Sequence, residues 1–194
     1  MSLSIFAQRF VVLVFCCDFF IELGKIVRAR VASGIAKRRI KEESLRQARL
    51  LAEGDIGTLS KRDIFMLGLG LYVGEGSKTS NAVRLSNSNP AIMRFSVRWF
   101  IETCGLAKEN LRIRMHLYPD SDENVCKRYW SKITGLPLNQ FQRTSFDVRT
   151  GKKIEKRGKL PYGTVHLSVR SISPKPLPVS LFKRIMAWIE VSLK

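Results

Sequence analysis

The sequence is poor in acidic residues, and this shortage is the first constraint on its function. Asp and Glu number 16 against 34 Lys and Arg, which gives a net charge of +18. A pI near 10.3 indicates a polyanionic partner, with nucleic acid as the first choice and an anionic membrane surface as the second. Because 45% of the residues are hydrophobic, the chain is not a disordered basic tail.

Cysteine is also scarce. The four cysteines, at positions 16, 17, 104 and 126, form neither a C-x-x-C pair nor a cluster with histidine. We therefore expect no structural zinc site and no disulfide framework, a pattern that suits a reducing compartment. The sequence predicts a cytoplasmic, nucleoid-associated protein without a small-molecule cofactor.

Long apolar runs are lacking as well. The run Ile64–Val73 is about half of the ~20 residues that a bilayer span needs. Residues 5–23 are apolar, but Asp18 interrupts them, and burying it in a membrane costs roughly 2.5–3.5 kcal/mol. The segment has neither the positive start nor the cleavage site of a signal peptide. We treat residues 1–24 as a separate apolar segment that forms a buried or dimer-facing helix; an altered or misassigned start is the alternative.

Residues 25–59 predict a basic helical arm. The stretch RRIKEESLRQARLLAE consists largely of good helix formers, and Gly54 and Gly57 end it. Its large apolar residues are too few for a wide core face. It is either a solvated connecting helix or an arm that contacts phosphates, and the net charge favours phosphate contact.

The rest of the chain, residues 60–194, is organised around DIFMLGLGLYVGEGSK, residues 63–78. Ser60 and Asp63 have the spacing of a helix-capping box. Gly70 and Gly74 share one helical face. Each glycine lowers helix stability by about 1 kcal/mol relative to alanine, a cost that is tolerated where another backbone must approach closely. The stripe predicts tight packing; the alternative is a buried helix capped by Gly76. Glu75 is a lone carboxylate at the end of this apolar helix.

After this helix, strand and helix patterns alternate. The strands are predicted at 82–88, 111–118, 141–149 and 164–170, and the helices at 91–104, 122–134 and 180–191. We expect an α+β fold in which an antiparallel sheet carries helices on one face.

The other face of the predicted sheet is basic. Its outward arginines are Arg84, Arg112, Arg114, Arg143, Arg149 and Arg170. His116 and His166 also face outward, where a surface contact is more common than a role as general base. The loop between the last two strands adds Lys152, Lys153, Lys156, Arg157 and Lys159. These residues predict a DNA-binding surface, although a solvated face and a hairpin tip without a ligand are the ordinary alternatives.

Residues 68–76, GLGLYVGEG, resemble the LAGLIDADG motif of homing endonucleases. The match lies at Gly70, Leu71, Gly74, Glu75 and Gly76, and the motif differs at positions 68, 69, 72 and 73. With the following VRLSNSNPAIMRF, the resemblance is to single-motif bacterial LAGLIDADG-like proteins and covers about residues 60–190.

The resemblance implies a saddle-shaped sheet along the DNA major groove and, because there is one motif, a homodimer. Leu67, Gly70, Leu71 and Gly74 would form the dimer interface. Glu75 and the carbonyl of Gly74 would hold a divalent metal such as Mg²⁺, which supplies the charge and activated water that phosphodiester cleavage needs. Lys78 would stabilise a phosphate or position a water. The alternatives are a non-cleaving transcriptional regulator of the same fold and a protein of anionic membranes.

Overall fold

The computed structural model describes residues 3–79, 82–147, 160–172 and 177–194. The chain divides into two compact units, residues 1–58 and residues 59–194, which we call the N-terminal and C-terminal units. The N-terminal unit is a single helix, α1 (Leu3–Ile56), which continues through both the apolar segment and the basic arm. Gly57, with φ 57°, follows its end.

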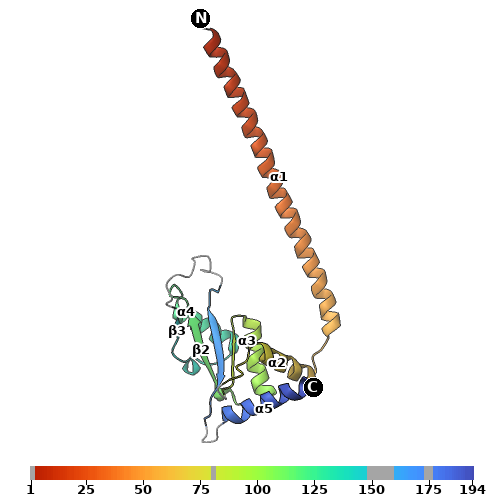
Figure 1. Cartoon of the computed structure of the whole chain (residues 1–194), viewed down its shortest axis with the longest axis vertical. Helices are drawn as coiled ribbons and strands as arrows, with labels where there is room; N and C mark the ends of the chain where they lie inside the picture. The colour runs from red at the N-terminus through yellow and green to blue at the C-terminus, as the bar shows by residue number, and fades with distance from the viewer. Residues whose placement is uncertain (1–2, 80–81, 148–159, 173–176) are drawn as a thin grey trace. The chain divides into compact units, whose positions relative to one another are not determined.

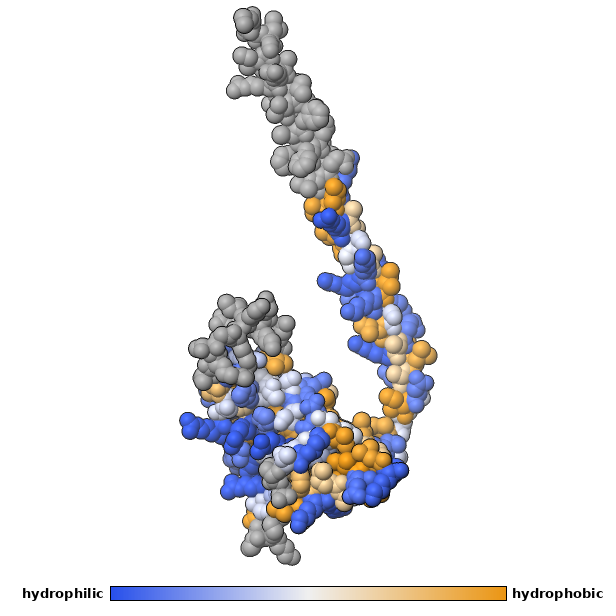
Figure 2. All heavy atoms as spheres, viewed as in Figure 1, coloured by the Kyte–Doolittle hydropathy of each residue, from blue (hydrophilic) through white to orange (hydrophobic). Residues whose placement is uncertain are grey.

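The described side chains of α1, from residue 24 onward, are almost all exposed. Hydrophobic and hydrophilic side chains are interspersed along the face of the helix that Figure 2 shows, and α1 concentrates its apolar residues on no one face. Glu43 accepts hydrogen bonds from Arg46 and Gln47 within the helix. Where the structure describes the chain, no helix has the combination of length and hydropathy that crossing a bilayer requires.

The C-terminal unit is an α+β fold, and its described residues form four helices, four strands and two short 3-10 helices (Figure 1). The helices are α2 (Lys61–Glu75), α3 (Pro90–Glu102), α4 (Glu123–Thr134) and α5 (Leu177–Ser192). The strands are β1 (Arg84–Asn87), β2 (Leu111–Leu117), β3 (Ser145–Phe146) and β4 (Thr164–Val169). The 3-10 helices are η1 (Lys108–Asn110) and η2 (Leu138–Gln140).

The four strands form one sheet in the order β1-β4-β2-β3. β4 is antiparallel to β1 and β2, but β3 is parallel to β2. The prediction of an antiparallel sheet is therefore wrong, and the sheet is mixed. Parallel neighbours need a crossover connection, usually a helix, and α4 lies between β2 and β3 in the chain.

The strand predicted over 141–149 is mostly absent from the described residues. Only Ser145–Phe146 pairs as a strand, and Phe141 makes an isolated parallel bridge to Ile113. The chain is instead anchored by Gln140, whose side-chain amide donates to the carbonyls of Lys108 and Leu111 at 2.7 and 2.8 Å. A side-chain anchor thus replaces part of the expected backbone ladder.

The core lies between one face of the sheet and the helices. The inward side chains of β2 and β4 alternate with outward ones as predicted, and all seven inward positions are buried. They are Leu111, Ile113, Met115, Leu117, Val165, Leu167 and Val169. Trp99, Phe100 and Trp130 are fully buried on the helical side.

The predicted start of α2 is confirmed, because Ser60 and Asp63 form the reciprocal capping box. Within this unit, a glycine of α2 that the sequence analysis did not single out makes a close contact with a side chain. A Cβ at Gly68 would lie 2.0 Å from Trp99 Cδ1, whereas Gly70 and Gly74 have open space. Trp99 Nε1 also donates to the carbonyl of Phe65 at 3.3 Å, so the indole lies directly against this turn of α2.

Candidate nucleic-acid interface

On the outward face of the sheet, polar and basic side chains form rows that run across the strands. Strand register places Arg84, Ser168 and Arg112 in one row and Ser86, His166 and Arg114 in the next. A third row contains Thr164, His116 and Ser145. The arginines of β1 and β2 therefore share one face with the imidazole of His166 in β4.

Much of this face is hollowed into a groove of about 390 Å³. The cationic and imidazole side chains that line it are Arg84, Arg114, His116, His166 and Arg170. None of the described residues that line the groove is acidic. Five of the predicted DNA-binding residues are thus brought together where an anionic ligand meets no carboxylate.

His166 lies near the middle of the groove and is half-buried. Its Nδ1 shares a hydrogen bond with the Ser86 hydroxyl. Burial lowers the pKa of His166 below its ordinary value of 6.5, and the nearby charges of Arg84, His116 and Arg114 lower it further. The imidazole is therefore predominantly neutral at neutral pH, and a phosphate entering the groove would favour its charged form.

Sequence reasoning did not assign Ser86 to the site. Its outward position in an alternating strand was visible, but its partner His166 is 80 residues away in the chain. Only the pairing of β1 with β4 reveals the contact.

Two predicted arginines lie outside the groove. The Nη1 atom of Arg112 donates to the carbonyls of Glu109 and Leu111 at 2.6 and 2.8 Å, and the side chain lines a separate hollow. Arg143 is exposed and follows η2, outside any strand. Of the arginines predicted to converge, Arg84, Arg114 and Arg170 therefore line the groove, whereas Arg112 lines the separate hollow and Arg143 lines neither.

The remaining predicted contacts fall between β3 and β4, outside the described residues. They are Arg149, Lys152, Lys153, Lys156, Arg157 and Lys159.

Glu75 is the last residue of α2 and is exposed. The next residue, Gly76, forms an antiparallel bridge with Leu85 of β1, and the amide of Ser77 donates to the carbonyl of Arg84 at 2.8 Å. Tyr72 holds the same turn, because its hydroxyl donates to the Ser77 carbonyl at 2.8 Å. Glu75 is thereby placed beside β1, one edge of the sheet.

Lys78 lies in the same turn. Its Nζ donates to the carbonyl of Gly76 at 3.0 Å. The ammonium group is thus held at the carbonyl of the residue that follows Glu75 in the chain.

A divalent metal fits this site only in part. The carboxylate of Glu75 is the oxygen ligand that Mg²⁺ prefers. Among the described residues, however, no group of three or more His, Cys, Asp or Glu side chains could hold an ion. The donor type therefore fits, while the set of donors on one chain is incomplete.

The surface of α2 that faces away from the core is apolar. Met66, Leu67 and Val73 are 37%, 52% and 38% exposed, with Gly70 and Gly74 open between them. Leu71 lies at the border and is partly buried against the core. In Figure 2 a hydrophobic patch lies over the α2 and α5 end of this unit, and hydrophilic side chains lie over the sheet end. The residues predicted for the dimer interface thus belong to, or border, an uncovered face.

A comparison of the chain with protein-family models, curated proteins and solved structures finds no match.

Proposed function

We propose that the protein is a DNA-binding homodimer that lays the outward face of its sheet on the duplex and carries a pair of Glu75 carboxylates for divalent metal. The observation that carries DNA binding is the groove, in which three arginines and two histidines meet without an acidic neighbour among the described lining residues. Phosphate backbones are bound by such clusters, and the release of counterions drives the binding.

The exposed face of α2 supports the dimer. Single-motif relatives of the LAGLIDADG type would pair through this helix, and the resemblance assigns Leu67, Gly70, Leu71 and Gly74 to the contact. Two glycines four residues apart, with nothing within 4 Å, leave space for a second backbone. Exposed apolar residues beside them supply area to bury. By the same resemblance, the sheet would be saddle-shaped and follow the major groove.

Two-fold pairing along α2 would also complete the metal site. Each chain contributes one Glu75 at the end of α2, so a pair of chains contributes two carboxylates close to the axis. Two such carboxylates repel, and a divalent cation relieves that repulsion. A bound Mg²⁺ would supply charge stabilisation and an activated water for phosphodiester hydrolysis. Lys78, held beside Glu75, would stabilise the phosphate.

The test is cleavage of supercoiled plasmid libraries with Mg²⁺ or Mn²⁺, comparing wild type with Glu75→Gln. Site-specific double-strand cuts that disappear in the variant are expected, because glutamine keeps the shape and loses the charge. Salt-sensitive duplex binding must be the same for both proteins, since Glu75 lies at the edge of the basic face. Equal binding without cutting by either protein would favour a non-cleaving regulator, and the absence of duplex binding at low salt would contradict the whole proposal.

The dimer is tested by Gly70→Leu, with Gly54→Leu in α1 as the matched control. A Cβ at either position has no neighbouring heavy atom within 4 Å in the chain. We expect Gly70→Leu to shift sedimentation toward the monomer and Gly54→Leu to leave it unchanged. A wild type that sediments as a monomer on DNA would contradict the dimer.

A further inference from the structure

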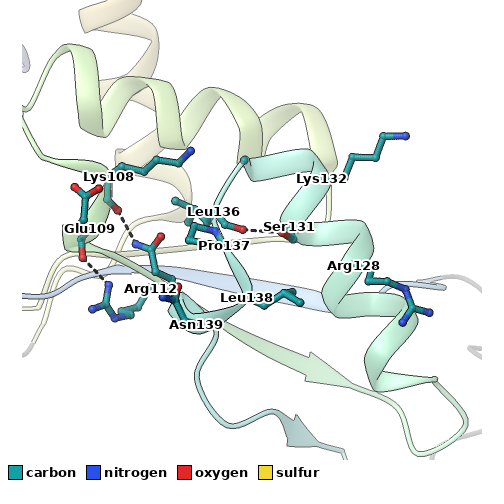
Figure 3. Close-up of a pocket in the computed structure, with 12 residues that line it drawn as sticks. Lys108, Glu109, Arg112, Arg128, Ser131, Lys132, Leu136, Pro137, Leu138 and Asn139 are labelled. Atoms are coloured by element: carbon teal, nitrogen blue, oxygen red, sulfur yellow. Dashed lines mark hydrogen bonds between the residues drawn. The ribbon is translucent and has the colours of Figure 1, made fainter.

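A second basic surface lies outside the groove, beside α4. It is a hollow of about 850 Å³ between η1, the end of α4 and η2 (Figure 3). Four cationic side chains line it, against the single carboxylate of Glu109. They are Lys108, Arg112, Arg128 and Lys132. We call this surface the α4 hollow.

The cations of the α4 hollow are available to a ligand. Among the described residues, no ion pair involves Lys108, Arg128 or Lys132, although Lys127 on the same helix pairs with Glu123 at 2.7 Å. Only one nitrogen of the Arg112 guanidinium, Nη1, donates to backbone carbonyls. Uncompensated cations at a concave surface attract anions.

The backbone around the hollow is fixed rather than loose. Gly135 ends α4 with φ 68°, a conformation that glycine adopts readily, and the Ser131 hydroxyl donates to the carbonyl of Leu136 at 2.7 Å. Gln140 ties the η2 side to the carbonyls of Lys108 and Leu111. The positive side chains therefore extend from a pre-formed frame.

The arrangement of the cations suits a chain of phosphates better than one small anion. Figure 3 shows Lys108, Arg128 and Lys132 extended around the hollow from two elements, rather than converging on a point. Duplex DNA presents phosphates at regular spacing, with one charge per about 1.7 Å of axis, so separate cations can each meet one.

The α4 hollow meets the outward face of the sheet at Arg112. This side chain lines the hollow, and its register places it in the row of Arg84 and Ser168. Glu75 adjoins β1, whereas the hollow adjoins β2, and β4 separates these two strands. In the proposed dimer the Glu75 pair lies near the axis, so the two hollows lie farther out along the duplex.

We propose that the α4 hollow binds the backbone phosphates of duplex DNA that flanks the stretch covered by the sheet. This proposal rests on the proposed DNA binding and extends it: the sheet holds the central part of the target, and the hollows hold its two ends. The required duplex is then longer than the sheet alone would need.

The variant that tests the hollow is Arg128→Gln/Lys132→Gln, two exposed positions on α4. The matched control is Arg98→Gln/Lys183→Gln, which removes the same charge from α3 and α5 at residues that line neither surface. Affinity is measured by fluorescence anisotropy over a salt series, with duplexes of about 12 and about 36 base pairs. Thermal unfolding followed by tryptophan fluorescence verifies that every variant is folded.

On the long duplex, the hollow variant is expected to lose affinity and to reduce the slope of log affinity against log salt by about 2, one for each phosphate contact removed. On the short duplex, the hollow variant must have the affinity and salt slope of the wild type. The control variant must match the wild type on both duplexes.

Three outcomes overturn the proposal. An equal loss on both duplexes, or in the control, would reduce it to a general effect of charge. No loss on the long duplex would remove the hollow from the interface while DNA binding by the sheet stands. A hollow that binds pyrophosphate through Arg128 and Lys132 without any dependence on duplex length would be a site for a small phosphate ligand. A wild type that binds neither duplex would contradict the proposed function itself.

Discussion

The two units of the chain are both basic and both contain helices, but they are stabilised in different ways. In α1, the described side chains are nearly all exposed, and its apolar residues gather on no single face. The C-terminal unit buries four aromatic side chains almost completely in one core, namely Tyr72, Trp99, Phe100 and Trp130. A helix without an apolar stripe depends on local propensity and on pairs such as Arg46 with Glu43, whereas a core depends on burial. The same substitution should therefore have different effects in the two units.

The largest difference is expected for truncation of a large apolar side chain. Trp130 is fully buried and its Nε1 donates to the Tyr162 carbonyl at 2.8 Å, so Trp130→Ala should lower the free energy of unfolding by about 3–5 kcal/mol. Leu51 of α1 is 70% exposed, and Leu51→Ala should change it by less than about 0.5 kcal/mol. Urea unfolding is followed by the fluorescence of the remaining tryptophans, Trp99 and Trp188. Similar losses in both variants would mean that α1 contributes to the core.

A smaller difference, with opposite signs, is expected for glycine to alanine. At Gly68 the new methyl group would meet the Trp99 ring, which cannot yield easily, and Gly68→Ala should cost about 1–3 kcal/mol. At Gly54, where there is open space, alanine improves helix propensity by up to about 1 kcal/mol.

Fluorescence-detected unfolding measures the first variant, and far-UV circular dichroism measures the second as a gain in helicity. A Gly68→Ala protein as stable as the wild type would show that α2 shifts away from Trp99.

The smallest difference concerns pH. Both histidines lie in the C-terminal unit, and the pKa of His166 is lowered in the fold by burial and then by Arg84, His116 and Arg114. The unfolded chain therefore binds this proton more readily, so the stability that His166 contributes is complete above about pH 6.5. It is lost as the pH falls from there toward the lower folded-state pKa.

His166→Gln should flatten the dependence of C-terminal unfolding on pH in that window. His116→Gln should leave most of that dependence in place, because burial is the largest cause of the lowered pKa of His166 and His116 contributes less. An unchanged slope in His166→Gln would assign the effect to other groups.

Local features of the fold were predictable from the sequence because their causes are local. The Ser60–Asp63 capping box joins residues three positions apart. At the start of α3, the Asn89 side chain accepts from the amides of Ala91 and Ile92, which are two and three positions away. The alternation of β2 needs only its own seven residues. The α+β class follows from the order of such segments.

The features that failed depend on pairing between distant segments. The parallel β3 is set by the α4 crossover and by the Gln140 anchor, which no strand pattern encodes. The close contact of Gly68 with Trp99 joins residues 31 positions apart (99 − 68), and no local pattern indicates it.

The candidate site divides in the same way. The outward direction of Arg84, Arg114, His116 and His166 was predictable from alternation, and these side chains do line one groove. The pairing of Ser86 with His166 and the separation of Arg112 into the α4 hollow require the strand order β1-β4-β2. The basic character of the site can thus be predicted from local strand patterns, whereas its division into two surfaces depends on tertiary structure.

The two edges of the sheet carry one more consequence. At one edge, Gly76 and Ser77 occupy backbone groups of Leu85 and Arg84 in β1. At the other edge, β3 has only two residues. Exposed edge strands invite pairing with other chains, and short or covered edges suppress it. Two copies of this unit are therefore discouraged from joining strand to strand into a larger sheet or a fibre, which agrees with the proposed pairing through the α2 face.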